Sequence, residues 1–331
     1  MYRATLIPGD GIGPEVTNAA VKVIEATGVD IQWETRYMGL TALEKFGNPL
    51  PEDTIRSIEN NKIALKGPVT TQIGGGFRSV NISLRQQLNL YVNIRPFQSF
   101  EGVKSRFDNV DLVVFRENTE DLYMGFEHMV GTDAAETIRL ITRHASEMIA
   151  SFAFNYAVKE KRKKVTCAHK ANIMQLTDGL FLSSVRNIAK KYPDIQYEEM
   201  EVGNLCMKLV MKPEDFDILV MPNLYGDIIS EFGAGLVGGL GVVAGANIGA
   251  EAAVYEATHG TAPNLVGKGI ANPTASILCG AMMLKRLGEK NASKRIYNAV
   301  VKTLAEGKHV TPDLGGTATT DEMTRCIIEN L

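Results

Sequence analysis

The sequence predicts an α/β fold, in which short strands alternate with helices. Residues 4–7 are strand-like and residues 9–13 form a glycine turn, after which apolar side chains recur at helical spacing over 16–24. Further short apolar runs, as expected of buried strands, lie at 112–115, 165–168, 218–221 and 253–255. Helical stretches lie between them, for example at 146–159 and 179–191. Such alternation is typical of α/β proteins.

Length and charge limit the class of protein and of partner. The chain has 331 residues and a formal net charge of −3, with acidic and basic residues mixed along its length. This size suits one or two domains, and the mixed charge argues against nucleic acid or an anionic membrane as the main partner. The four cysteines lie far apart without metal-ligand spacing, which indicates a reducing compartment. We therefore expect the cytoplasm, or the mitochondrial matrix if a leader was removed, and no membrane span.

The turn after the first strand-like segment contains Gly9, Gly11 and Gly13, with Pro14 directly after them. A Rossmann dinucleotide fingerprint would need a small residue where Pro14 stands, so that motif fails. Pro14 instead suits the first turn of a helix, where a missing N–H costs nothing. Taken alone, the segment is an ordinary glycine turn between a strand and a helix.

A second glycine-containing segment has more specific features. Glycines at 74–76 would let the backbone approach a ligand, and Ser79 suits the N-cap of a helix. Asn81 and Arg85 lie four residues apart, and therefore on one face of that helix. Such a face can bind carboxylates.

Three arginines, Arg85, Arg95 and Arg116, are candidates for binding a polyanionic acid. Each guanidinium is a planar fork of donors that matches the geometry of a carboxylate. Taken singly, each is better explained by a surface ion pair.

Two further side chains follow strand-like segments, where α/β folds build their sites. Tyr123 ends a polar stretch that begins after residues 112–115, and Lys170 follows residues 165–168. A tyrosine can donate a proton if a nearby cation lowers its pKa. Alone, either residue is better explained as structural.

Two carboxylates suggest a metal site. Asp227 and Glu231 lie four residues apart at the predicted start of a helix, and thus on one of its faces. Mg²⁺ and Mn²⁺ prefer such oxygen ligands together with substrate oxygens and water. The alternative is a solvated acidic first turn favoured by the helix dipole. Further along, a loop of small residues that includes His259 could wrap a nucleotide, although this signal alone is weak.

Taken together and in this order, these segments resemble the β-decarboxylating dehydrogenases, the family of isocitrate, homoisocitrate and isopropylmalate dehydrogenases. Five motifs carry the resemblance, at residues 9–13, 116–120, 169–172, 223–227 and 259–263. The resemblance covers essentially the whole chain and implies a two-domain α/β fold that differs from the Rossmann fold. It implies a large domain on the cofactor side (1–98 and 233–331) and a small domain (99–232) at a dimer interface. The expected partner is a second copy, with active sites shared between subunits.

The resemblance also implies roles for individual residues. Ser79, Asn81, Arg85, Arg95 and Arg116 look like the substrate-binding set, and Tyr123 with the neighbouring subunit's Lys170 looks like the proton-transfer pair. Asp227 and Glu231 look like the ligands of Mg²⁺ or Mn²⁺. The cofactor-binding set implied is Ile12, His259, Gly260, Thr261, Ala262, Asn264 and Asn272.

The implied reaction is oxidation of a 2-hydroxy acid by a nicotinamide cofactor, followed by loss of CO₂ and protonation by Tyr123. Isocitrate is the expected substrate, because Ser79 and Asn81 stand where isocitrate dehydrogenases bind the extra carboxylate. NAD is the expected cofactor, because Asn264 and Leu265 replace the Lys and Tyr of NADP-using relatives.

The chain departs from the family pattern at two places. Glu231 stands where Asp is usual, which lengthens the side chain by one methylene. Gly203 stands where relatives have an Asp that reaches the metal of the adjacent subunit. We expect its absence to weaken metal binding or to remove a proton acceptor, unless Glu201 or Asn204 substitutes. Gly203 motivates one alternative, a regulatory subunit without turnover. A further alternative, an enzyme for homoisocitrate or isopropylmalate, would differ only in the pocket around residues 79–85.

Overall fold

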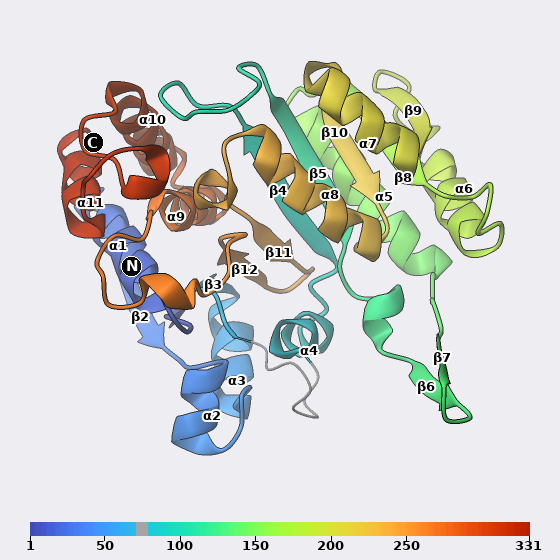
Figure 1. Ribbon diagram of the computed structural model, residues 1–331, viewed down its shortest axis with the longest axis horizontal. Helices are drawn as coiled ribbons and strands as arrows, with labels where there is room; N and C mark the ends of the chain where they lie inside the picture. Colours follow the sequence, from blue (N-terminus) through green and yellow to red (C-terminus); the bar gives the residue numbers. More distant parts are fainter. Residues whose placement is uncertain (71–78) are drawn as a thin grey trace.

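The computed structural model describes residues 1–70 and 79–331, and within them ten strands form one continuous sheet (Figure 1). The glycines at 74–76 lie outside the described residues. In sheet order the strands are β2 (Ile31–Thr35), β1 (Tyr2–Ile7), β3 (Ile63–Lys66), β12 (Ala253–Glu256), β11 (Ala246–Ile248), β4 (Val92–Gln98), β5 (Asp111–Glu117), β10 (Ile218–Met221), β8 (Lys164–His169) and β9 (Gln196–Glu201).

The sheet consists of two parallel halves that run in opposite directions. β2, β1, β3 and β12 are parallel to one another, and so are β5, β10, β8 and β9. Between them, β11 pairs antiparallel with both β12 and β4, and β4 pairs antiparallel with β5. The two halves therefore meet through antiparallel strands near the middle of the sheet.

Helices cover both faces of the sheet and confirm the predicted α/β class. They are α1 (Gly13–Ala26), α2 (Leu40–Phe46), α3 (Glu52–Asn61), α4 (Val80–Gln87), α5 (Arg143–Lys159), α6 (Thr177–Ala189), α7 (Val202–Met211), α8 (Asn223–Leu236), α9 (Thr274–Leu287), α10 (Lys290–Glu306) and α11 (Thr320–Glu329). Pro14 occupies the first turn of α1 as predicted. Ser79 precedes α4 as expected, but its side chain makes no capping hydrogen bond there.

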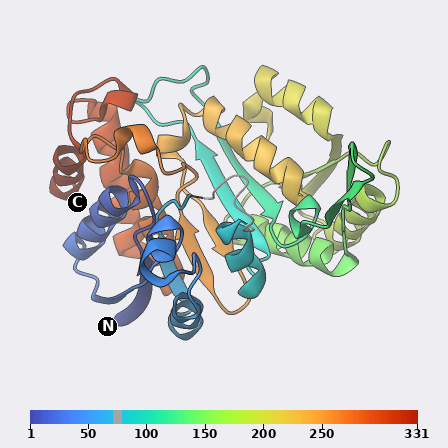
Figure 2. The same cartoon turned by 60° about the horizontal axis from the view of Figure 1, so that its bottom comes forward.

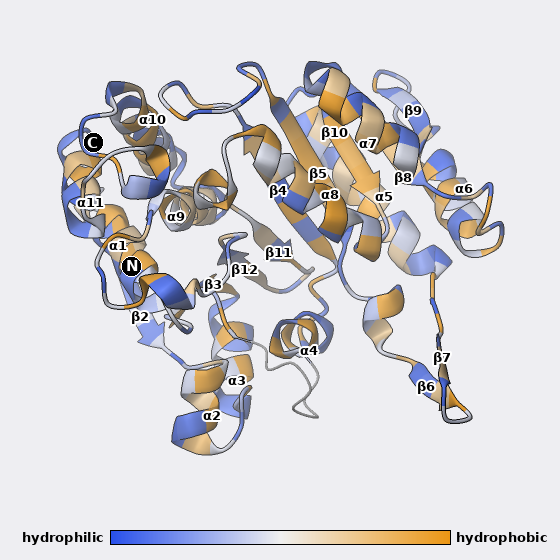
Figure 3. Cartoon of the chain, in the orientation of Figure 1, coloured by the Kyte–Doolittle hydropathy of each residue, from blue (hydrophilic) through white to orange (hydrophobic). Residues whose placement is uncertain are grey.

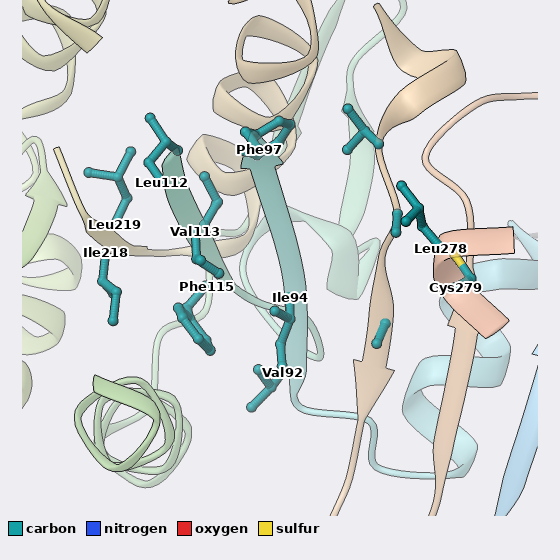
Figure 4. Close-up of a cluster of buried hydrophobic side chains, with 14 of the residues drawn as sticks. Val92, Ile94, Phe97, Leu112, Val113, Phe115, Ile218, Leu219, Leu278 and Cys279 are labelled. Carbon is teal, nitrogen blue, oxygen red and sulfur yellow. The ribbon is translucent and has the colours of Figure 1, made fainter. Parts of the chain in front are cut away.

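Along the central strands β4 and β5, side chains point alternately to the two faces of the sheet, so these strands pack against helices on both faces (Figure 4). The Phe115 ring packs against Tyr156 of α5, with ring centroids 5.0 Å apart. Phe97 of β4 instead packs where α8 carries Gly233, and a Cβ there would lie 2.9 Å from the Phe97 ring. β5 and β10 are the hydrophobic centre of the half of the sheet formed by β5, β10, β8 and β9 (Figure 3). Arg116 follows Phe115, so it points to the α8 side of the sheet.

The strand predicted at 218–221 has the bounds of β10, and the other predicted strands lie within observed ones. The two chain ends lie in the same half of the molecule, where α1 contacts α11 (Figures 1 and 2). The domain boundary expected at 98–99 falls between β4 and β5, and that at 232–233 falls within α8. The division into two domains remains a prediction.

A two-stranded arm, β6 (Glu127–Val130) and β7 (Ala134–Thr137), projects from the body of the molecule (Figure 1). All its strand residues are exposed. In the described parts of the chain, no helix combines the length and apolar character that crossing a membrane requires.

The predicted glycine turn at residues 9–13 contacts three other segments of the chain, at residues 40–41, at Thr70 and at Thr261. Asp10 is buried, and its carboxylate accepts hydrogen bonds from the backbone N–H groups of Leu40, Thr41 and Thr70 at 2.9 Å each. Gly11 has a φ of +62°, and a Cβ there would overlap the carbonyl oxygen of Thr261. Glycine is therefore required at position 11 for both its conformation and its size.

We expect Gly11→Ala to destabilise the protein more than a change in backbone conformation alone would. Positive φ costs an L-residue about 1–2 kcal/mol, and overpacking adds roughly 1–3 kcal/mol. Gly28→Ala is the matched control, because Gly28 has a φ of +85° and a Cβ added there would meet nothing within 4 Å. Urea denaturation measures both variants; equal losses of unfolding free energy would contradict the role of the Thr261 contact.

Candidate active site

Three arginines come together at the centre of the molecule. Arg116 of β5 is 1% exposed, and Arg95 of β4 and Arg85 of α4 are each 8% exposed. Arg95 and Arg116 share one face of the sheet, because Arg116 pairs with Asn93, two residues before Arg95. Burial, followed by repulsion from Arg85, lowers the pKa of Arg95 and lowers that of Arg116 to about 10. The cluster therefore favours an anion.

Helix α8 supplies the groups that hold Arg116. The Arg116 Nε donates to Asn223 Oδ1 at 2.8 Å, and a terminal nitrogen of the same guanidinium donates to Asp227 Oδ1. Tyr123 Oη donates to Asp227 Oδ2 at 2.5 Å, and the Arg116 guanidinium lies 5.0 Å from the centre of the Tyr123 ring. A Cβ at Gly226 would overlap Arg116, so glycine allows this close approach.

The pKa values of Tyr123 and Asp227, which share a hydrogen bond, shift in opposite directions. Burial and the hydrogen bond to the Asp227 carboxylate raise the pKa of Tyr123 to about 12. The lowering of this pKa by a cation that the sequence suggested is therefore wrong for this structure: Arg116 acts in that direction but is outweighed. Burial would raise the pKa of Asp227, but Arg116 and the Tyr123 hydroxyl outweigh it and lower that pKa. At neutral pH, Tyr123 is protonated and Asp227 is ionised.

Other polar atoms of this region are buried without a partner. Among the described residues these include Asn81 Oδ1 and Arg85 Nε, which share one face of α4. Buried polar atoms normally have partners. A polar ligand beside α4 would satisfy both.

A second set of charges lies beside the arginines. Glu256 ends β12 and pairs in register with Lys66, which ends β3. The Lys66 side chain is 1% exposed; its Nζ donates to Glu256 Oε2 and, at 3.1 Å, to the Gly67 carbonyl. Glu256 also accepts from Asn247 at 2.6 Å and lies 3.6 Å from Arg85. Burial opposes ionisation, yet Lys66 and then Arg85 lower the pKa of Glu256 to about 2.

The predicted cofactor residues come from three loops that lie together. The Ile12 N–H donates to the Thr261 carbonyl at 3.0 Å, and Ile12 shares an apolar cluster with Ala262. His259 Nδ1 contacts the Gly260 carbonyl at 3.0 Å. Asn264 is exposed, whereas Asn272 is buried and donates to Asp313 at 3.0 Å.

These loops fit a nucleotide cofactor. His259 Nε2 and Thr258 Oγ1 are buried without a hydrogen-bond partner, and burial lowers the pKa of His259. A neutral imidazole with an unpaired ring nitrogen can hydrogen-bond a neutral group such as a base or a ribose hydroxyl.

The proposed metal ligands lie one turn apart on α8. Asp227 has a side chain that is 40% exposed, and Glu231 is exposed. Within the described residues, no group of three or more His, Cys, Asp or Glu side chains is arranged to hold a metal. Two carboxylates fit Mg²⁺ or Mn²⁺ when substrate and water complete the coordination.

Lys170 follows β8, two strands away from β5, and its Nζ pairs with Glu201 at the end of β9. Several residues of the site were not among the predictions: Asn223, Lys66, Glu256 and the buried pairs of Arg139 with Asp121 and Asp178. Lys66 and Glu256 each end an apolar strand, and a charged residue in that position is the sequence feature that could have identified them as site residues.

Known proteins resemble this chain along essentially its whole length. The family model described as isocitrate/isopropylmalate dehydrogenase matches residues 3–327. An Arabidopsis thaliana relative named mitochondrial isocitrate dehydrogenase [NAD] catalytic subunit 5 is 50% identical, over 99% of this chain and 88% of its own. A Dictyostelium discoideum relative, named as a regulatory subunit of mitochondrial isocitrate dehydrogenase [NAD], is 48% identical, over 100% and 93%. The crystal structure of isocitrate dehydrogenase from Methylococcus capsulatus superposes with a TM-score of 0.97 at 54% identity, covering 100% of this chain and 99% of the other.

We expect Lys66→Met to destabilise the protein by about 3–5 kcal/mol near neutral pH, because it leaves a buried carboxylate without its main partner. Lys62→Met is the control, since Lys62 is exposed and lies 3.6 Å from the exposed Glu251; its loss costs roughly 0–1 kcal/mol. Because folding lowers its pKa, Glu256 contributes stability that is fully present above about pH 4.5 and is lost as pH falls towards about 2. The difference in unfolding free energy between wild type and Lys66→Met should therefore shrink as pH falls from about 4.5 to about 2. A pH-independent difference in unfolding free energy would contradict the pairing.

Proposed function

This chain belongs to the isocitrate/isopropylmalate dehydrogenase family, and on that premise we propose that it catalyses the oxidative decarboxylation of isocitrate to 2-oxoglutarate. NAD would accept the hydride, and Mg²⁺ or Mn²⁺ would bind at Asp227 and Glu231. The observation that carries the proposal is the buried cluster of Arg85, Arg95 and Arg116. In the described part of the chain, Asp227 pairs with Arg116, and Glu256 is shared between Arg85 and Lys66.

Isocitrate is favoured over related acids by the polar surroundings of α4. Isocitrate has three carboxylates, and isopropylmalate has an apolar branch in place of one. Asn81 and Ser79 are polar, and a carboxylate beside α4 can accept hydrogen bonds from the Asn81 amide N–H and the Ser79 hydroxyl. An apolar branch in the same place would leave these donors without an acceptor, which is unfavourable.

The chain's own residues would then act as follows. Arg85, Arg95 and Arg116 orient the substrate carboxylates through charge-assisted hydrogen bonds. Tyr123 holds its proton at neutral pH and can deliver it to the carbon left by CO₂. A bound divalent metal supplies Lewis acidity at the substrate hydroxyl, and a bound nicotinamide accepts hydride.

NAD is proposed rather than NADP because the exposed Asn264 and its neighbour Leu265 bring no positive charge. A 2′-phosphate would need a cation such as arginine or lysine nearby.

We propose that a second copy of the chain completes the site and supplies Lys170. Large apolar side chains are exposed on and next to the arm, on the segment before α6, and on α7 and α8, namely Phe126, Met129, Val130, Ile138, Leu140, Ile173, Leu176, Met207, Val210, Met211 and Ile228. Exposed apolar surface on this scale favours a protein interface. The four free cysteines suit the cytoplasm or the mitochondrial matrix.

A regulatory subunit without turnover is the second candidate, supported by Gly203 and by the similarity to a relative named as a regulatory subunit. The purified chain, assayed with isocitrate while Mg²⁺ and Mn²⁺ are titrated, decides between the two. We expect NADH formation in excess of NADPH formation. No turnover in a folded chain that still binds isocitrate would favour the regulatory role.

Asn81→Leu tests the substrate assignment. We expect it to reduce kcat/KM for isocitrate by about 10²-fold or more, since a substrate polar group loses its partner. Activity on isopropylmalate should fall less or rise. Specificity constants for both acids measure this, and equal losses on both would contradict the assigned contact.

A further inference from the structure

Lys170 and Glu201 form an ion pair at the ends of neighbouring strands. β8 and β9 are parallel, and their register places His169 opposite Glu201. Lys170 is the next residue after β8, and its Nζ donates to Glu201 Oε1. The two side chains are 36% and 27% exposed. An ordinary pair at this exposure contributes little to stability, so its effect must come from where it holds the ammonium group.

Both partners are held by the surrounding structure. The Lys170 N–H donates to Asp178 Oδ2 at 2.5 Å, and Asp178 is fully buried in its pair with Arg139. The second oxygen of Glu201 accepts the Asn204 N–H at 3.0 Å and thereby caps the N-terminus of α7. These contacts fix the backbone at Lys170 and the side chain of Glu201, so less entropy is lost when the pair forms than for two free side chains.

Gly203 makes room for this arrangement. A Cβ at position 203 would lie 3.1 Å from Glu201 Oε2, tighter than most such contacts, so the carboxylate would have to shift by a few tenths of an ångström. Glycine in a helix is about 1 kcal/mol less favourable than alanine, and its backbone here does not need a positive φ. The space it leaves lets Glu201 turn back to the helix end and reach Lys170 at the same time.

We propose that Glu201 is the positioning residue for Lys170: its carboxylate holds the ammonium group in the place where the proton-transfer step needs it, and Gly203 is the residue that permits this. The inference rests on the proposed function through the role of Lys170. Lys170 lowers the pKa of Glu201, in agreement with the pairing.

Glu201→Gln is the main test, because glutamine keeps an oxygen for the α7 cap and removes the charge. We expect kcat for isocitrate to fall about 10–100-fold while KM and Tm stay close to wild type. The solvent isotope effect on kcat should rise, since proton transfer becomes slower. In a Lys170→Met background the same change should have no further effect. Glu199→Gln is the matched control, because Glu199 lies on the same strand and pairs with Arg186.

Gly203→Ala is a second variant that a purely structural role would affect differently. It adds helix propensity and so should leave Tm unchanged or higher, yet crowd Glu201 and lower kcat several-fold. Wild-type kcat in both Glu201→Gln and Gly203→Ala would overturn the proposal.

A readout independent of turnover separates this inference from the proposed function. The rate of reductive methylation of Lys170, followed by mass spectrometry, should rise several-fold in Glu201→Gln and stay unchanged in Glu199→Gln. If the wild-type chain does not oxidise isocitrate, the proposed function fails while this measurement still tests the pairing. An unchanged methylation rate in Glu201→Gln would overturn the pairing whatever the activity.

Discussion

The contact between Arg116 and helix α8 is the interaction on which the site depends. A guanidinium that is almost fully buried needs compensating partners, because its desolvation is expensive. Asn223 and Asp227 provide them from the first turns of α8, and Gly226 allows the helix to lie against the arginine. This contact fixes the helix that carries both proposed metal ligands and orients the carboxylate that accepts the hydrogen bond of Tyr123.

The same burial explains why the region suits an anionic substrate. Burial, and after it repulsion from Arg85, lowers the pKa values of Arg95 and Arg116. Glu256 is largely engaged by Lys66, and Asp227 by Arg116. A polycarboxylate would relieve the remaining repulsion in a low-dielectric site, where the gain is larger than in water. Charge balance, rather than shape alone, is thus the basis for the proposed specificity.

Much of the fold could be predicted from the sequence, because buried parallel strands are short apolar runs and β10 contains nothing else. The antiparallel strands at the centre of the sheet could not be predicted in this way. β11 has only three residues, and β4 contains Asn93, Arg95 and Pro96, so it lacks the apolar run that indicates a buried strand. The three arginines were candidates from their chemistry and from the family resemblance. Their convergence depends on strand register, and so does the Lys66–Glu256 pair, whose members are 190 residues apart. No local pattern reports such a pairing.

The most direct test of the account is a crystal structure of the chain with isocitrate and Mn²⁺. We predict that carboxylates of isocitrate lie within hydrogen-bond distance of Arg85, Arg95 and Arg116, with the metal bound to Asp227 and Glu231. Isocitrate bound elsewhere, or absent at saturating concentration while the arginines keep their present partners, would contradict the assignment of this cluster as the substrate site.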